Sequence, residues 1–356
     1  MKIAVVGMGV SGSYLSNQLS GNSSSSIGSH QVTSFERYPE KKYQCVCAWG
    51  TSKHYISGYA KKCGLNFDEY ILHEGSRMLV SIGGTEVEAP LCGLVTFDKH
   101  RFLQDMQRGQ KIRFGSFIRS EEDLKGRYDL VIDATGLRTL LPRIQQHEVM
   151  IPCVQYTVKY RDPPFDDFYV EILQDMSGYL WYFPLGDGRA HVGAGDLNHG
   201  HQAILQRFFD RFGGEKEEVG GKPVRICPPR NCQPFRLGRV VGVGESIGTV
   251  FPLLGEGIIP TLQCSDLLLS NLDDLDRYCS EVLSQFSFYG TAYSFLEPLL
   301  RGEINLLDHA GLSLAVLMHM RANETRYGFR MGLSGLSIEP FSFINQMIRT
   351  ASKVRL

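Results

Sequence analysis

The stretch KIAVVGMGVSG, residues 2–12, decides the fold of this chain. Its first five residues form a short β-rich run, and a G-x-G-x-x-G pattern follows immediately before an apolar-periodic segment that suits a helix. In such a unit the first glycine permits a tight turn, the second lets the backbone approach a pyrophosphate, and the third lets helix and strand pack closely. The helix N-terminus supplies amide donors and the positive end of the dipole. The pattern predicts a dinucleotide-binding turn whose contacts are Gly7, Gly9, Val10, Ser11 and Gly12.

An acidic residue ends the next strand-like run, QVTSFE, at Glu36. A carboxylate at this point accepts hydrogen bonds from an adenosine ribose, and Arg37 beside it is assigned to the same cofactor site. The separation from the glycine turn is a few residues longer than usual, and a serine-rich insert accounts for the excess. The alternative is a coincidental glycine turn.

A second buried strand, YDLVIDATG, ends at residues 134–136. It resembles the second signature of two-dinucleotide-type flavoproteins, in which the chain passes close to the cofactor. The resemblance favours FAD over NAD and implies cofactor contacts from Ala134, Thr135 and Gly136.

The later stretch VVGVGESIGTVFPLLGEGIIP, residues 240–260, is spelled like a second fingerprint. Its third glycine comes one residue too late, and no acid-ended strand follows. It resembles instead the late flavin motif of the FAD-dependent monooxygenase and reductase superfamily, G-D-A-A-G, then P, then G-x-G-I, with Glu245 in place of the usual aspartate. The resemblance implies cofactor contacts from Gly244, Glu245, Gly248, Pro252, Gly255, Glu256, Gly257 and Ile258. A purely structural glycine-rich turn remains the alternative.

Residues 176–184, earlier in the chain, form an aromatic strand pattern, and a Gly-Asp-Gly hairpin turn connects it to a second strand. Tyr179, Trp181 and Phe183 alternate and are predicted to share one face of a sheet, which is compatible with an ordinary core. The run matches the Y-x-W-x-F-P signature of the geranylgeranyl reductase family, within the p-hydroxybenzoate hydroxylase-like flavoproteins. That resemblance implies that the strand, including Pro184, lines an isoprenoid pocket beside the flavin.

The same resemblance places Cys47 and Trp49 at the substrate pocket. Cys47 is the candidate proton donor or substrate contact, although a buried inert thiol fits the residue equally well. The superfamily has an arginine near the start of a helix where this chain has Lys99, with Arg101 nearby. We assign Lys99 to the cofactor site, and solvation of one of the two charges is the competing interpretation.

These motifs predict an α/β chain (α+β overall): a Rossmann-like FAD-binding domain, an antiparallel β-sheet substrate domain and C-terminal helices. The FAD-binding domain is expected to be discontinuous, over residues 1–73, 98–149 and 235–271. The substrate domain is expected over 74–97 and 150–234, and the helical region over 272–356.

The composition limits which classes of partner and ligand the protein is expected to bind. The 37 basic and 38 acidic side chains nearly cancel, so nothing indicates a nucleic acid. The chain shows no secretion signal and no long apolar run, and a cytoplasmic protein is expected, with peripheral membrane contact left open by a small basic C-terminal tail. Nine cysteines do not form a compact metal-binding pattern, so no metal is expected.

The leading hypothesis is an FAD-dependent oxidoreductase that saturates C=C bonds of geranylgeranyl or other isoprenoid chains, in the synthesis of prenyl lipids such as those of archaeal-type membranes. Ferredoxin, a deazaflavin and NADPH remain open as the electron donor. An FAD-dependent aromatic monooxygenase and a non-catalytic flavin-binding or lipid-binding homologue are the alternatives.

Overall fold

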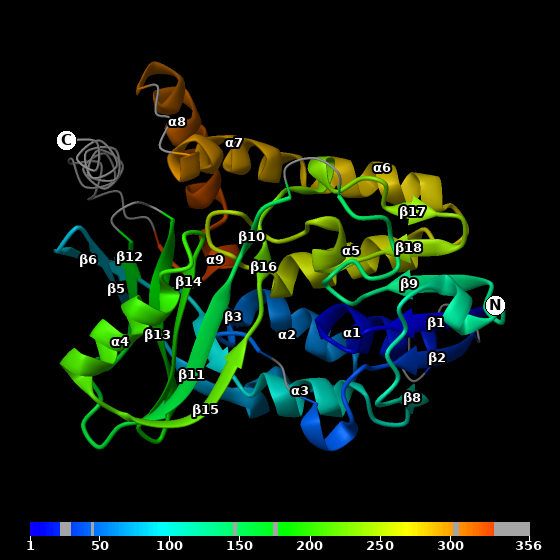
Figure 1. The fold of residues 1–356 in the computed structure, drawn as a ribbon, viewed down its shortest axis with the longest axis horizontal. Coiled ribbons are helices and arrows are strands. Elements are labelled where there is room, and N and C mark those ends of the chain that lie inside the picture. The colour runs from blue at the N-terminus through cyan, green and yellow to red at the C-terminus, as the bar shows by residue number, and fades with distance from the viewer. Residues whose placement is uncertain (22–29, 44–45, 145–147, 174–176, 302–305, 331–356) are drawn as a thin grey trace.

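The computed structural model describes residues 1–21, 30–43, 46–144, 148–173, 177–301 and 306–330. Two large sheets lie side by side, and a layer of C-terminal helices covers both (Figure 1). The helical expectation for residues 331–356, together with the basic tail, lies outside the described residues.

The first sheet has six strands in the order β17-β18-β9-β1-β2-β8. All its pairs are parallel except β17–β18. Helix α1 packs against α3 and α5, and residues Ile3–Val6 at the centre of the sheet are buried on both faces, as is typical of parallel strands. The bounds are β1 Lys2–Val6, β2 Gln31–Phe35, β8 Ile112–Arg113, β9 Leu130–Asp133, β17 Arg236–Leu237, β18 Val240–Gly242, α1 Val10–Leu19, α3 Lys99–Met106 and α5 Ile258–Ser270.

The second sheet has seven strands in the order β15-β11-β14-β13-β12-β5-β6. The turn between β13 and β14 places Asp187 and Gly188 at φ values of 50° and 70°, the left-handed pair that a two-residue hairpin requires. Leu180 and Tyr182 pack with helix α4 on one face of this sheet. The bounds are β5 Arg77–Ile82, β6 Thr85–Pro90, β11 Cys153–Lys159, β12 Phe168–Ile172, β13 Gly178–Gly186, β14 Arg189–Asp196, β15 Glu215–Gly221 and α4 His201–Phe212.

Two details differ from the single antiparallel sheet expected for the second region. Strands β5 and β12 pair in parallel, because a long connection rather than a hairpin joins them. Strand β7 (Leu94–Phe97) pairs with β3 (Gly50–Ser52) and β4 (Ile71–Glu74), and β10 (Met150–Ile151) pairs with β16 (Val224–Arg225), so both form small sheets of their own.

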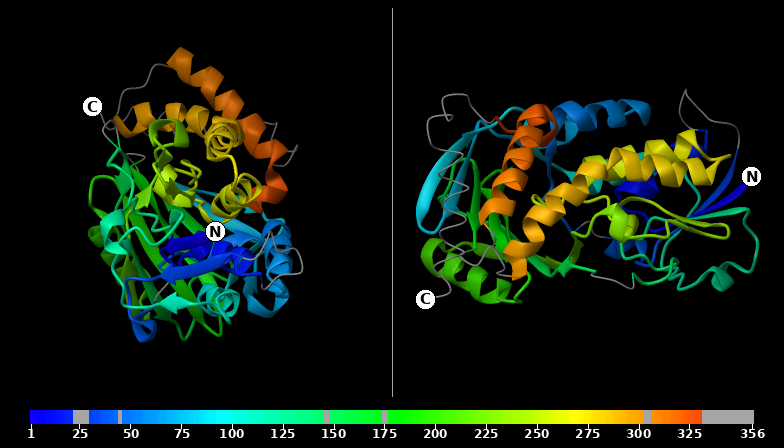
Figure 2. Two further views of the ribbon diagram at one scale, coloured as in Figure 1. Left: turned by 90° about the vertical axis from the view of Figure 1, so that its right-hand side faces the viewer. Right: turned by 90° about the horizontal axis from the view of Figure 1, so that it is seen from above.

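The remaining helices are α2 Lys53–Lys62, α6 Leu275–Gln285, α7 Ser287–Arg301, α8 Leu306–Ala322 and α9 Glu324–Tyr327. Helices α6 and α7 run along one side of the molecule and α8 crosses α7 (Figure 2). No helix among the described residues is both long and apolar enough to cross a membrane.

Candidate active site

The glycine turn has the geometry of a phosphate cradle. Gly7 adopts φ 95°, and a Cβ on Gly12 would lie 1.8 Å from the Gly7 carbonyl oxygen, so both positions require glycine. Gly9 precedes helix α1, and a Cβ added to it would meet nothing within 4 Å. The first turn of α1 holds no acidic residue, so its positive dipole end is not neutralised. The turn therefore borders open space at Gly9, at the positive end of α1.

Glu36 is 6% exposed and lies beside this turn. Its two oxygens accept hydrogen bonds from the amides of Met8 and Tyr38, both at 3.0 Å. These bonds fix the orientation of the carboxylate and leave its other lone pairs for a ligand. Arg37 donates to the Tyr38 hydroxyl at 2.6 Å and stacks on that ring, so its guanidinium lies toward the solvent end of the site.

Residues 134–136 form the floor of the site between the two sheets. The buried Asp133 carboxylate organises this turn, since it accepts hydrogen bonds from the Thr135 amide and hydroxyl and from the Leu140 amide. Gly136 adopts φ 70°, and a Cβ there would lie 3.2 Å from the Glu245 carboxylate. The second and third motifs are therefore adjacent in space.

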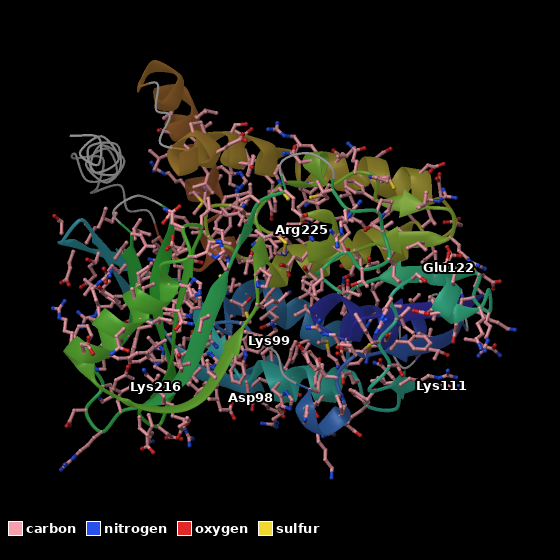
Figure 3. The ribbon with its side chains drawn as sticks, viewed as in Figure 1. Asp98, Lys99, Lys111, Glu122, Lys216 and Arg225 are labelled. Carbon is pink, nitrogen blue, oxygen red and sulfur yellow. The ribbon has the colours of Figure 1, made fainter. Side chains whose placement is uncertain are left out.

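Glu245 forms an ion pair that the sequence did not reveal. Its Oε2 lies 2.6 Å from Lys222 Nζ, and its Oε1 accepts a hydrogen bond from the Arg225 amide at 3.1 Å. Arg225 is almost fully buried and pairs with Glu148. In Figure 3, Arg225 and Lys99 both lie toward the middle of the molecule, whereas Lys111 and Lys216 lie at its edges.

Three of the predicted cofactor glycines do not line the cavity among the described residues: Gly12, Gly244 and Gly248. A Cβ on Gly248 would lie 2.6 Å from the Cys227 carbonyl oxygen, and one on Gly244 would lie 3.0 Å from the Thr261 hydroxyl. These glycines allow close packing of the backbone behind the site, and their contact with a cofactor stays a prediction.

Glu256 connects the late glycine segment to the C-terminal helices. Its Oε1 accepts a hydrogen bond from the Ile259 amide at the start of α5, and its Oε2 lies 2.9 Å from Arg326 Nη1. Burial disfavours the charged guanidinium, but Glu256, Tyr289 and Tyr327 together outweigh it and raise the pKa of Arg326. Arg326 is 7% exposed, and no sequence motif pointed to it.

The aromatic strand β13 faces the same cavity through Tyr179, Trp181 and Phe183. The Tyr179 hydroxyl donates to the Leu254 carbonyl at 2.7 Å, and the Trp181 indole donates to Gln155 Oε1 at 3.2 Å. Pro184 is buried and does not line the cavity, and its carbonyl oxygen accepts a hydrogen bond from the Thr96 hydroxyl. The strand is thus attached to the late glycine segment and also borders the cavity.

Cys47 lines the cavity, but Trp49 does not. Trp49 adopts φ 63°, and its ring packs edge-on against His191 with the ring centres 4.6 Å apart. The Trp49 ring is thus placed against His191 in this structure, and its contact with a substrate stays a prediction. Lys99, by contrast, is buried and does line the cavity, whereas the Arg101 side chain is 53% exposed.

The residues named above as lining residues border one cavity of about 980 Å³. One arm runs from the glycine turn past Gly136 to residues 255–258, which begin α5. Another part of the lining comes from the seven-stranded sheet and helices α7 and α8; we call it the apolar arm because most of its side chains are apolar, with Glu88, Ser313 and Arg330 among the exceptions. The side chains of this second arm include Met78, Val80, Val170, Ile172, Leu254, Phe295, Val316, Leu317 and Phe329.

No family model matches the chain. The chain is 34% identical over 151 residues to digeranylgeranylglycerophospholipid reductase 2 of Methanothermobacter thermautotrophicus, covering 39% of each protein. It is 29% identical over 280 residues to the protein of the same name from Methanopyrus kandleri, covering 65% of this chain and 68% of that one. The match thus spans only about two fifths of the length of the first relative.

Two solved structures share the fold. A geranylgeranyl bacteriochlorophyll reductase-like protein of Thermoplasma acidophilum superimposes with a TM-score of 0.65 at 15% identity, over 90% of this chain and 98% of that one. PqsL, a probable FAD-dependent monooxygenase from Pseudomonas aeruginosa, gives a TM-score of 0.63 at 14% identity, over 88% and 99%. The predicted fold class is confirmed: the chain has the Rossmann-like architecture of FAD-dependent flavoproteins. The predicted resemblance to geranylgeranyl reductases is confirmed as well.

Proposed function

Because the chain is related to the geranylgeranyl reductases within the FAD-dependent flavoproteins, we propose that it is an FAD-dependent reductase that saturates isolated C=C bonds of isoprenoid chains in prenyl lipids. The observation that carries the proposal is the single cavity in which a dinucleotide arm opens into an apolar arm. The curated relatives act, by their names, on a digeranylgeranyl glycerophospholipid, which is a substrate of this chemical class.

The residues present fit FAD. We assign the pyrophosphate to the Gly7–Ser11 turn, which borders open space at Gly9 at the positive end of α1, and the adenosine ribose to Glu36. We assign the ribityl chain to the Glu245–Lys222 pair and the pyrimidine edge to the N-terminus of α5 at residues 257–258. The volume of about 980 Å³ lies at the upper end of ligand cavities, which allows a second ligand beside the cofactor.

Reduced FAD, when bound, supplies a hydride to one carbon of the double bond. The protein must therefore hold the chain, exclude water and deliver a proton to the other carbon. The apolar arm does the first two, since a polyprenyl chain offers no polar handle and binds through buried area at about 25 cal/mol per Å². Cys47 is the group at the cavity wall that we propose as the proton donor.

We further propose that the two large sheets mark the FAD-binding and substrate domains, and that the protein works in the cytoplasm at the surface of the membrane that holds its lipid. The apolar arm supports this placement, because a prenyl lipid must leave a bilayer to reach it.

The test is a single-turnover reaction without oxygen. FAD-loaded protein, reduced with dithionite, is mixed with a geranylgeranylated glycerophospholipid and with geranylgeranyl diphosphate. We expect the flavin absorbance to return and the lipid to gain two mass units per bond. Failure with both substrates would refute the proposal.

A monooxygenase is the second candidate, because PqsL shares the fold. Oxygen-dependent addition of 16 mass units to an aromatic compound would support that function instead. Purified protein that neither carries nor binds FAD would favour the non-catalytic alternative.

A further inference from the structure

Gln155 links the aromatic strand β13 to Cys47 and Ala48, which we call the cysteine segment. It lies on β11 directly opposite Gly193 of β14, and Gly193 lies directly opposite Trp181 of β13. A Cβ on Gly193 would lie 2.2 Å from Trp181 Cζ2, so the indole lies flat over the strand between them. The missing side chain at Gly193 lets the indole N–H reach Gln155 Oε1 across that strand, at 3.2 Å.

The chemistry of this bond sets the orientation of the Gln155 amide. An indole N–H only donates, so the atom that faces Trp181 must be the amide oxygen. The amide nitrogen then faces the backbone carbonyl of Cys47, to which it donates at 3.1 Å. Gln155 is 8% exposed; its bond with Trp181 is buried and its bond to Cys47 is partly buried.

A second bond holds the next residue. His191 Nδ1 lies 3.3 Å from the Ala48 carbonyl oxygen. Burial lowers the pKa of His191 to about 4, so the neutral ring donates this bond at neutral pH. Two successive carbonyls of the cysteine segment are thus held by the seven-stranded sheet.

The Cys47 thiol lies beside two other cavity groups. Burial, with smaller contributions from Glu245 and the Cys47 thiol, raises the pKa of Cys153 to about 12. Cys47 and Cys153 also add to the effect of burial in raising the pKa of Tyr179. All four of these residues line the cavity.

We infer that Gln155, held by the Trp181 indole, is a positioning residue that keeps the Cys47 thiol at the cavity wall for proton delivery to the substrate. The inference rests on the proposed function. The hydride adds to one alkene carbon, the S–H bond of Cys47 breaks as a C–H bond forms at the other carbon, and the thiolate regains its proton from water.

The first test is a double-mutant cycle in FAD-loaded protein, measuring kcat and KM for the geranylgeranyl lipid. We expect Gln155→Met to lower kcat about ten-fold with KM changed less than two-fold. In a Cys47→Ala background the same change should have no further effect, because Gln155 acts only through Cys47. Gln206→Met, on the exposed face of α4, is the matched control and should leave kcat unchanged.

A Gln155→Met effect of equal size in the Cys47→Ala background would overturn the inference, because a general structural role is additive. If Gln155→Met does not fold, Trp181→Phe removes the indole N–H and keeps a ring. It should show the same dependence on Cys47.

The second test needs no substrate. Iodoacetamide alkylation of FAD-loaded protein is followed by mass spectrometry of the Cys47 peptide, with Cys279 on α6 as the internal reference. We expect Gln155→Met to change the Cys47 rate at least about five-fold and the Cys279 rate not at all. Equal Cys47 rates would overturn the inference. A changed rate in a protein inactive on every lipid would refute the proposed function and leave the positioning role supported.

Discussion

The ion pair between Arg326 and Glu256 allows a quantitative prediction. Arg326→Met keeps most of the side-chain length and removes the charge. It leaves the Glu256 carboxylate, whose side chain is 16% exposed, without its cation, and it removes the bond to the Tyr289 hydroxyl. Breaking a buried pair from one side costs roughly 3–5 kcal/mol, and the residual exposure of Glu256 favours the lower end.

The expected loss of free energy of unfolding corresponds to a fall in melting temperature. An unfolding entropy of about 2.1 cal/mol/K per residue over 356 residues turns about 3 kcal/mol into a fall of about 4 °C. Glu256→Gln in the same chain removes the unpaired charge and keeps an acceptor for the Ile259 amide, so the double variant should recover most of the loss. Differential scanning calorimetry measures both, and flavin fluorescence titration should show weaker FAD binding in the single variant.

Arg277→Met is the matched control. Arg277 pairs with Glu281 on helix α6 at the same 2.9 Å, but its side chain is 67% exposed. Exposed pairs contribute little, so this variant should lower the melting temperature by less than about 1 °C. If Arg326→Met is no more destabilising than Arg277→Met, or if Glu256→Gln does not restore stability, the argument from burial is wrong.

Three further predictions follow from the site. Gly12→Ala should abolish FAD binding or folding, because its Cβ would meet the Gly7 oxygen at 1.8 Å. Gly58→Ala, with open space around it in α2, should leave FAD binding unchanged and should not lower the melting temperature. Flavin absorbance and melting temperature distinguish the two variants. Glu245→Ala should weaken FAD binding about ten-fold in a fluorescence titration, and an unchanged Kd would remove it from the cofactor site. Because the folded-state pKa of His191 is depressed to about 4, stability present above pH 6.5 should fall by about 2 kcal/mol between pH 6.5 and 5, and His191→Gln should flatten that slope in thermal melts.

The motifs predicted the fold because each one encodes a local backbone requirement. Gly7 and Gly136 adopt positive φ values, and Gly12 admits no Cβ, so these residues can be recognised without knowing their neighbours. Alternation along β13 likewise separates Tyr179 and Trp181 from Leu180, since successive side chains point to opposite faces.

Local sequence patterns do not reveal which residues depart from the common backbone conformation. Trp49 is not a glycine, yet it adopts φ 63°, and its ring packs against His191 rather than facing the cavity. Arg138 donates to the carbonyls of Pro142, Pro234 and Ser246, and this is a structural role that only the fold reveals.

By itself the sequence determined the strands, the glycine turns and the class of cofactor fold, because these depend on residues that are close along the chain. The tertiary structure decided the partners: Lys222 with Glu245, Arg326 with Glu256, and Gln155 with both Trp181 and the Cys47 carbonyl. These partners are 23, 70, 26 and 108 residues apart. A hydrogen bond or ion pair requires atoms about 3 Å apart, and only the packing of the two sheets and the C-terminal helices sets distances on that scale.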